Sequence, residues 1–393
     1  MERVLTRNRL TFMTLLAAAA LGLSACAGGA PDVSWPGLAA SDQLAFVVYN
    51  QQVHAVDLTT HQQAWAFPPT PNNNTGMFFA SPGVSAEVVV VGSEGPLNSY
   101  SGVVYGVNPA TGNQLWCLAF DKKGGDRQNC PLADASAGGG LFGISAPNDN
   151  RVIGGISLSD GAAYFGLASG RMYAVEAASG KVLWSFSAEH AVWAAPVVDD
   201  GTVYVASLDH KVYALDRKTG EPTWTQDLLS AIAGTPALAG NTLYVGTFGS
   251  RVVALDTATG DEKWSAPANQ WVWGGPVVAA GTVYFTDLSG TVFAVDAAHG
   301  TQKWAVTPGG VMTASPALTA DALYVGDRGG KLFALDPATG AVKAGWPLEV
   351  GGELLGAPII AGEAILIAPH KGENLLAAYQ ADGTLAWPFA PSK

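Results

Sequence analysis

The stretch VYALDRKTGEPTW, from Val212 to Trp224, returns almost unchanged further along the chain. The next two copies are VVALDTATGDEKW at 252–264 and VFAVDAAHGTQKW at 292–304. In each copy an aspartate, a glycine and a tryptophan stand at the same offsets, and the tryptophans recur every 40 residues. A period of 20 to 50 residues is typical of propellers and solenoids. This repeat therefore decides the fold.

Eight copies of the pattern cover most of the chain. They end at Trp65, Trp116, Trp184, Trp224, Trp264, Trp304, Trp346 and Trp387. Two further motifs keep the same period, a Val-Tyr-Val motif such as GTVYVA at 201–206 and a proline motif such as AAPVV at 194–198. Alternating apolar and small residues between glycine turns predict four short strands in each unit. The chain is therefore expected to be all-β, an eight-bladed β-propeller of four-stranded antiparallel blades.

The repeated carboxylates are expected to build turns rather than to catalyse a reaction. A carboxylate at a strand end can accept hydrogen bonds from backbone N–H groups two and three residues on, and a glycine then supplies a left-handed backbone angle. The tryptophan is expected to dock on the neighbouring blade, where its indole N–H finds an acceptor. Eight outward copies would not converge on one substrate, so Asp256→Ala should lower stability and leave any activity in place. The structural set is Asp216, Gly220, Trp224, Asp256, Gly260, Trp264, Asp296, Gly300 and Trp304.

The N-terminus has the pattern of an export signal. Arg3, Arg7 and Arg9 precede an apolar run that ends in Leu-Ser-Ala-Cys at 23–26. This ending resembles a bacterial lipobox, which implies cleavage before Cys26 and a lipid on its thiol; the alternative is an ordinary secretory signal with a chance cysteine. We expect a lipoprotein signal peptide at 1–25, a short tether at 26–32 and the propeller at 33–393. Seven tether residues span at most roughly 25 Å.

Composition and charge narrow the function. Apolar residues make up 48% of the chain and charged residues 13%, which permits a large packed core. The net charge of −12 and the absence of a Lys/Arg cluster beyond the first ten residues argue against nucleic acid. Export makes a Cys117–Cys130 disulfide the default, with free thiols or a metal as weaker alternatives. The six histidines show no zinc-binding spacing, so no metal site and no catalytic residue are proposed.

The consensus Ala-x-Asp-x-x-Thr-Gly-x-x-x-Trp resembles the tryptophan-docking repeat of the pyrroloquinoline-quinone (PQQ)-like β-propeller family. Together with the lipobox, it is similar to the BamB-like lipoproteins. The resemblance implies a non-catalytic, monomeric scaffold without a cofactor, anchored in a bacterial membrane (the periplasmic face of an outer membrane or the outer face of a cell membrane), which binds proteins during outer-membrane protein assembly. One alternative is a PQQ- and Ca²⁺-dependent dehydrogenase, although the Cys-Cys pair that many such enzymes carry is missing. Another is a ligand-binding sensory lipoprotein.

A binding surface is expected where the repeat is broken. Phe79, Trp193, Trp271 and Trp273 come just before the innermost strands and should gather at one end of the central channel. They either fill the axis as core or form a contact surface for a peptide or a small ligand. A second break is an insertion of about 28 residues between Trp116 and Trp184, which contains the Cys117–Cys130 loop. This loop is either a docking arm or a tolerated excursion.

Overall fold

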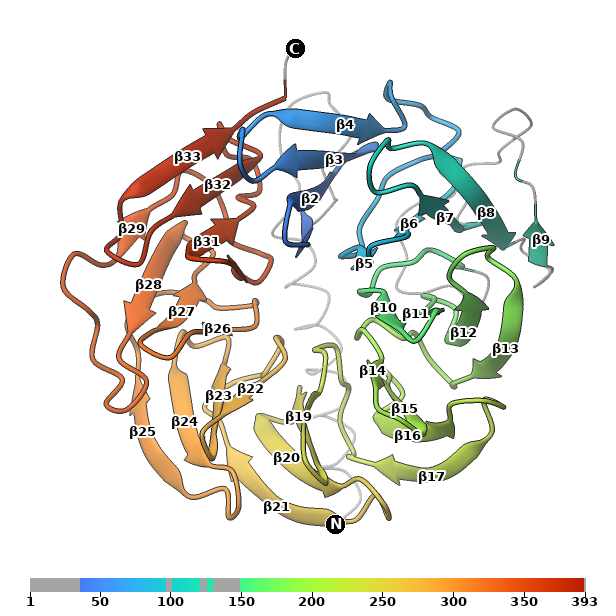
Figure 1. Cartoon of the computed structure of the whole chain (residues 1–393). Helices are drawn as coiled ribbons and strands as arrows, with labels where there is room; N and C mark the ends of the chain where they lie inside the picture. The colour runs from blue at the N-terminus through green and yellow to red at the C-terminus, as the bar shows by residue number, and fades with distance from the viewer. Residues whose placement is uncertain (1–35, 97–100, 121–125, 129, 131–148, 392–393) are drawn as a thin grey trace, which may run out of the picture. The chain divides into compact units, whose positions relative to one another are not determined.

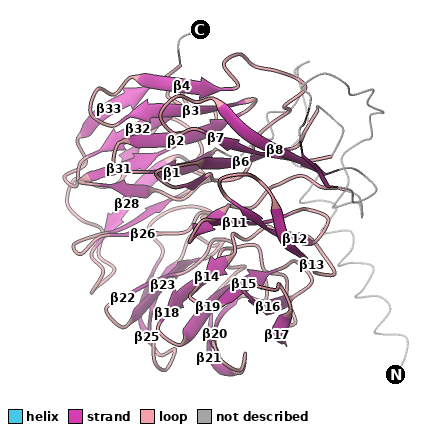
Figure 2. Cartoon of the chain, turned by 45° about the vertical axis from the view of Figure 1, so that its right-hand side comes forward, coloured by secondary structure: helices cyan, strands magenta, loops and turns pink. Residues whose placement is uncertain are grey.

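The described chain forms eight antiparallel sheets that follow one another around a ring (Figure 1). The computed structural model describes residues 36–96, 101–120, 126–128, 130 and 149–391. The predicted all-β, eight-bladed propeller is confirmed, and Figure 2 shows strands and loops in the described part and no helix. Accordingly, none of the described residues forms a long apolar helix of the kind that could span a membrane. The expected signal peptide, lipidation site and tether at 1–32 lie outside the described residues.

Each sheet uses strands that are consecutive in the chain. The first four blades consist of β1 (Gly37–Ala40), β2 (Leu44–Tyr49), β3 (Gln52–Asp57), β4 (Gln63–Phe67); β5 (Gly83–Val84), β6 (Val89–Ser93), β7 (Val103–Val107), β8 (Gln114–Phe120), β9 (Asp126–Gln128); β10 (Ser157–Ser159), β11 (Ala162–Gly166), β12 (Arg171–Glu176), β13 (Val182–Ser187); and β14 (Val197–Val198), β15 (Thr202–Ala206), β16 (Lys211–Asp216), β17 (Pro222–Asp227).

The other four blades follow the same order. They consist of β18 (Ala237–Ala239), β19 (Thr242–Thr247), β20 (Arg251–Asp256), β21 (Glu262–Pro267); β22 (Val277–Ala279), β23 (Thr282–Thr286), β24 (Val292–Asp296), β25 (Gln302–Val306); β26 (Ala317–Leu318), β27 (Leu323–Gly326), β28 (Lys331–Leu335), β29 (Leu348–Glu349); and β30 (Ile359–Ala361), β31 (Ala364–Ile367), β32 (Leu376–Tyr379), β33 (Leu385–Phe389).

The second and third strands of each blade form its core. In β15 and β16 the run from Val203 to Ala206 and the run from Val212 to Leu215 are buried on both faces of the sheet. Each sheet is covered on both sides by its neighbours, which is why these strands read as continuous apolar runs instead of strict alternation. The outer strand β17 is mostly exposed, and polar residues occupy it.

Tryptophans of the outer strands join neighbouring blades. The ring of Trp224 lies against Gly260 of the next blade, so closely that an added Cβ at Gly260 would meet Trp224 Cε3 at 2.6 Å. Its Nε1 donates to the carbonyl of Thr257 at 2.9 Å. The same bond recurs from Trp65 to Pro109 (2.7 Å), Trp116 to Ala177 (2.8 Å), Trp184 to Arg217 (2.9 Å), Trp264 to Ala297 (3.1 Å) and Trp304 to Pro337 (3.0 Å).

The ring closes by packing the first blade on the last, without exchange of a strand. One buried cluster combines Leu38 and Val47 of the first blade with Leu366 and Trp387 of the last. Here His61 takes the place of the docking glycine, with φ of 60°, and its ring stacks on Trp387 at 4.9 Å between centroids. The atypical terminal repeats therefore meet at the closure, where atypical copies are expected.

The insertion begins as an extra strand on the second blade. Cys117 and Cys130 form a disulfide, and β9 pairs antiparallel with β8 to give this sheet a fifth strand. This part of the insertion covers the outer edge of the blade, and edge strands are where unwanted pairing begins. Residues 131–148 lie outside the described residues, so a docking role for the rest of the insertion stays a prediction.

Antiparallel order gives the propeller two different faces. The turns between first and second strands and between third and fourth strands lie on one face, which we call the Asp-turn face. The turns between second and third strands lie on the other, together with the connectors that lead into each next blade; we call this the connector face. Backbone bonds join these turns to the connectors, from Leu208 N to Ala191 O (2.9 Å), Phe248 N to Ala231 O (2.9 Å), Leu288 N to Trp271 O (3.1 Å) and Arg328 N to Val311 O (2.8 Å).

Candidate functional site

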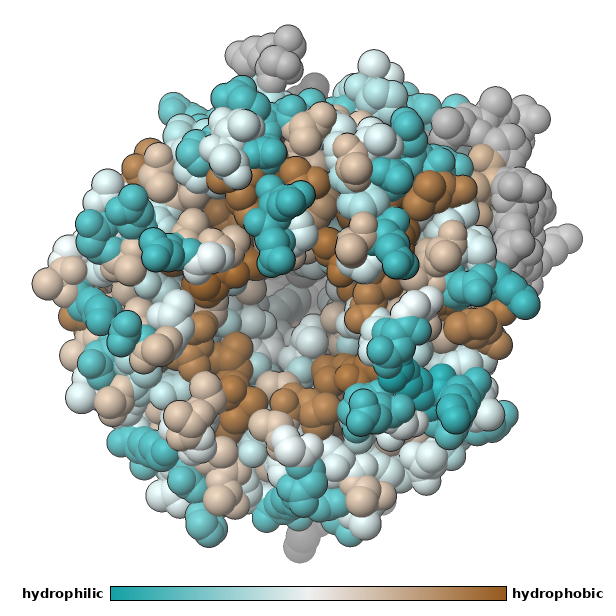
Figure 3. All heavy atoms as spheres, viewed as in Figure 1, coloured by the Kyte–Doolittle hydropathy of each residue, from teal (hydrophilic) through white to brown (hydrophobic). Residues whose placement is uncertain are grey.

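The channel wall is built from small residues at the start of the innermost strands. Gly234 lies so close to the next blade that an added Cβ would meet the carbonyl oxygen of Trp273 at 2.7 Å. Ala195 N donates to Thr235 Oγ1 across blades at 3.1 Å. At Gly234 this spacing leaves no room for a larger side chain. Figure 3 shows one face of the molecule hollowed at the centre of the ring, with hydrophobic residues around the opening.

The aromatic residues expected at the channel lie in connectors of the connector face, in different sectors. Phe79, Trp193 and Trp273 each stand three positions before the proline motif, at the connector-face end of the second, fourth and sixth blades. Trp193 is half-buried, and its indole Nε1 has no hydrogen-bond partner among the described residues. The equivalent positions in the fifth and seventh blades hold Ala233 and Thr313. These aromatic residues therefore stand in the connectors into three different blades.

Trp271 and Trp273 form a stack with a residue that sequence reasoning missed. The ring of Phe248 lies 4.8 Å from that of Trp271, at 8° between planes, and 4.9 Å from that of Trp273, at 29°. Phe248 comes from the β19–β20 turn of the fifth blade, whereas both tryptophans come from the connector into the sixth. The sequence does contain a signal for Phe248, because it is aromatic at a turn position that holds Leu208, Leu288 and Arg328 in other blades.

Exposed aliphatic side chains flank this stack on the connector face. Leu229, in the connector into the fifth blade, is 80% exposed, and Val311, in the connector into the seventh, is 42% exposed. Trp271 between them is 38% exposed. Three successive connectors therefore each present a large apolar side chain to solvent. We call Leu229, Phe248, Trp271, Trp273 and Val311 the apolar arc.

Phe79 has a charged environment instead. The guanidinium of Arg151 lies 6.0 Å from the centre of its ring and pairs with Asp149 at 2.6 Å. Nearby Glu94 is buried and accepts a hydrogen bond from Met77 N at 3.2 Å. Burial raises the pKa of the Glu94 carboxyl above its ordinary value. This sector of the channel mouth is polar where the arc is apolar.

The repeated carboxylates are used by their own turns. Asp216 Oδ1 accepts hydrogen bonds from Lys218 N at 3.0 Å and Thr219 N at 2.9 Å. Bonds from the backbone and the hydroxyl of Thr219 lower the pKa of Asp216, because they favour its charged form. The same pair of backbone donors reaches Asp57, Asn108, Asp256, Asp296 and Asp336. These positions therefore have the geometry of Asx turns.

Three buried carboxylates on the connector face are likewise engaged by backbone N–H groups. Asp287 accepts hydrogen bonds from Asn269 N and Gln270 N, both at 2.9 Å, and so ties its turn to the preceding connector. Asp209 and Asp327 make the same link through Glu189 N at 2.8 Å and Gly310 N at 2.9 Å. Within the described ranges, no three His, Cys, Asp or Glu side chains gather as a metal site would require. These acids therefore link the turns of the connector face to the preceding connectors.

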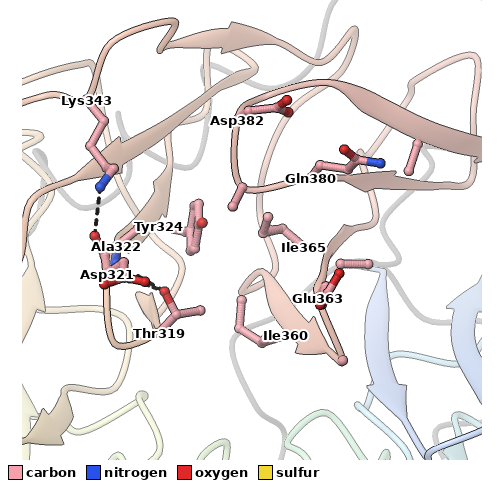
Figure 4. A pocket seen from close by; sticks show the side chains of 14 residues that line it. Thr319, Asp321, Ala322, Tyr324, Lys343, Ile360, Glu363, Ile365, Gln380 and Asp382 are labelled. Atoms are coloured by element: carbon pink, nitrogen blue, oxygen red, sulfur yellow. Dashed lines mark hydrogen bonds between the residues drawn. The ribbon is translucent and has the colours of Figure 1, made fainter.

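A groove lies between the seventh and eighth blades on the Asp-turn face. It has a volume of about 780 Å³ and is lined by Asp321, Tyr324, Ile360, Glu363 and Asp382 among others (Figure 4). Lys343 Nζ donates to the carbonyl of Asp321 at 2.9 Å. A second groove of about 490 Å³ occupies the corresponding place between the first and second blades. Because the groove recurs between blades, the propeller architecture itself accounts for it.

Comparisons with known proteins agree with this architecture. The family described as outer membrane protein assembly factor BamB matches residues 100–231, 208–345 and 290–392. The crystal structure of BamB from Moraxella catarrhalis superposes with a TM-score of 0.65 at 17% identity, covering 91% of this chain and 94% of that one. A computationally designed protein, Ika8, superposes with a TM-score of 0.64 at 16% identity, covering 90% of this chain and 95% of that one.

No curated protein matches the sequence. At these identities the two solved structures support the fold alone, whereas the family match spans the chain from residue 100 to residue 392. The chain therefore belongs to the BamB family of PQQ-like repeat propellers.

Proposed function

We propose that this protein is a non-catalytic scaffold of the bacterial envelope, anchored by a lipid on Cys26, that binds partner proteins in the manner of an outer-membrane assembly factor. The family match over residues 100–392 carries the proposal. The lipobox at Leu23–Cys26 supports the anchor, since it places a cysteine directly after the apolar run. As a scaffold, the propeller would provide rigid surfaces for binding and would catalyse no reaction itself.

The state of the carboxylates supports a scaffold over an enzyme. A calcium-dependent quinoprotein needs several carboxylate and amide oxygens directed at one ion. Here the repeat aspartates and the buried acids of the connector face accept hydrogen bonds from nearby backbone N–H groups. An oxygen that is already bound in this way, at a separate place in each blade, is a poor candidate for a shared cofactor site.

Affinity capture from an envelope extract of the native host tests the proposal. The tagged mature chain should recover a partner protein in stoichiometric amount. A matched control is Asp256→Ala, which alters a repeat turn and should recover the same partner. Recovery of no partner, combined with an absorbance change on titration with PQQ and Ca²⁺, would refute the scaffold role and favour the dehydrogenase. Recovery of a small molecule alone would favour the sensory lipoprotein.

A further inference from the structure

We propose that the apolar arc is a membrane-contact surface, so that the propeller lies with its connector face against the lipid. The proposal rests on the lipid anchor at Cys26 that belongs to the proposed function, and it adds an orientation and a second contact. Three observations carry it: the exposed side chains of the arc, the place where the chain joins the first blade, and the distribution of charge between the two faces.

The arc has the composition of a shallow membrane contact. Leu229, Trp271 and Val311 are exposed at 80%, 38% and 42%, and they stand on three successive connectors of one face. Tryptophan is enriched where membranes meet water, because its ring is apolar and its N–H is polar. Exposed apolar side chains on neighbouring connectors of one face mark a contact with protein or membrane. The other exposed large hydrophobics of the described residues, Leu115, Leu183, Val342 and Leu385, stand in the outer segments of four separate blades. The two remaining observations decide between these.

The described chain begins on the connector face. Pro36 directly precedes β1, at the end of the innermost strand that the connectors reach in every other blade. Ten residues separate Cys26 from Pro36, so a fully extended tether reaches roughly 35 Å. A path over the rim crosses the three strand spacings from β1 to β4, roughly 14 Å, and then descends a strand length of about 17 Å. That path uses most of the tether, so a lipid on Cys26 favours a membrane on the connector-face side.

The distribution of acidic residues also favours the connector face as the face toward the membrane. The Asp-turn face exposes an acid in most of its first turns, namely Asp42, Glu87, Asp160, Asp200, Asp321 and Glu363, of which Asp160 pairs with Arg217 at 2.8 Å. A membrane with anionic lipids repels such a surface. On the connector face Glu94, Asp149, Asp209, Asp287 and Asp327 are buried.

Two exposed acids of the connector face pair with basic side chains. Glu189 pairs with Lys211 at 2.5 Å, and Glu353 pairs with Arg328 at 3.4 Å. The connector face is therefore the less acidic of the two, and it is the face that can approach lipid headgroups with the smaller electrostatic penalty.

A labelled, tethered form of the protein tests the orientation. Residues 1–26 are replaced by a hexahistidine tag, which keeps the tether from Ala27 onward, and the protein is held on phosphatidylcholine vesicles that contain a nickel-chelating lipid. A single cysteine carrying an environment-sensitive NBD fluorophore is placed in the arc by Val311→Cys. The matched control is Glu363→Cys on the Asp-turn face, at another exposed turn position.

The label at 311 should shift to the blue, gain intensity and be quenched by a spin-labelled lipid, while the label at 363 should do none of these. Adding Trp271→Ala should reduce the response at 311. A response at 363 instead would overturn the proposal and show that the Asp-turn face lies against the lipid. No response at either position would also overturn it.

Partner capture from the envelope extract keeps the two proposals apart, because it is measured in detergent without vesicles. If Trp271→Ala abolishes capture and the label at 311 ignores lipid, the arc is a protein-docking surface and the membrane contact is refuted. If capture fails altogether but the label at 311 responds, the scaffold role fails and the orientation stands.

Discussion

The contact between Trp224 and Gly260 provides the sharpest test of how the blades are joined. Gly260 has φ of 78°, and an added Cβ would meet Trp224 Cε3 at 2.6 Å and Cδ2 at 2.8 Å. Gly260→Ala therefore meets two penalties, a left-handed backbone that alanine avoids and a collision with the ring of the neighbouring blade. The first costs about 1–2 kcal/mol and the second about 1–3 kcal/mol. The free energy of unfolding should fall by about 2–5 kcal/mol.

The same blade contains a matched control that separates the two penalties. Gly240 also has a positive φ, of 55°, but nothing lies within 4 Å of the Cβ that alanine would add there. Gly240→Ala should therefore lose only the backbone contribution, about 1–2 kcal/mol. The loss of chain entropy in the unfolded state is similar for both substitutions, so it cancels in the comparison.

Urea unfolding followed by tryptophan fluorescence and by circular dichroism gives both values. The effect of Gly260→Ala is then measured again in a Trp224→Leu background, where the collision is absent. There the loss in free energy of unfolding should equal that of Gly240→Ala. Equal losses for Gly260→Ala and Gly240→Ala in the unaltered chain would refute the reasoning. They would mean that the ring moves aside freely and that the Trp–Gly contact does not fix the spacing of the blades.

Three further changes test other parts of the structure. Trp184→Phe removes the N–H that bonds Arg217 O at 2.9 Å, and should lower the free energy of unfolding by about 1–2 kcal/mol in urea melts. Glu94→Gln should stabilise the fold at pH 7, because burial raises the pKa of this carboxyl; the gain should vanish as the pH falls below about 4.3, where the carboxyl is protonated in the folded and unfolded states alike. Cys117→Ser should cost about 3 kcal/mol by opening the loop to Cys130, and hydrogen exchange should show faster exchange along β8.

The fold could be predicted from the sequence because its determinants are local and copied. The period of 40 residues, the glycine turns and the short apolar runs lie within each unit, and each blade buries them in the same way. Asp216, Gly220 and Trp224 could be assigned as a set for the same reason. Their contacts reach only their own turn or the adjacent blade, and every copy repeats the same environment.

The apolar arc could be predicted only in part, because its contacts depend on how different copies meet. Trp271 and Trp273 stood out as departures from the repeat, but Phe248 is separated from them by more than twenty residues and belongs to another blade. Its stacking follows from the register between a turn and the next connector, which no local pattern encodes. Strand β9 was missed for a different reason, since Asp126–Gln128 has no apolar alternation; it pairs with β8 next to the Cys117–Cys130 disulfide.

Comparison of the repeat copies distinguishes structural features from candidate functional ones. A feature that recurs among the copies, such as the Asx turn or the groove between blades, is explained by the ring and needs no ligand. Features found once are the arc across the fifth to seventh blades and the fifth strand on the second blade. In a ring of eight, the second and sixth blades are four positions apart, on opposite sides of the channel. A partner that binds the edge of the second blade therefore leaves the arc free to contact another surface at the same time.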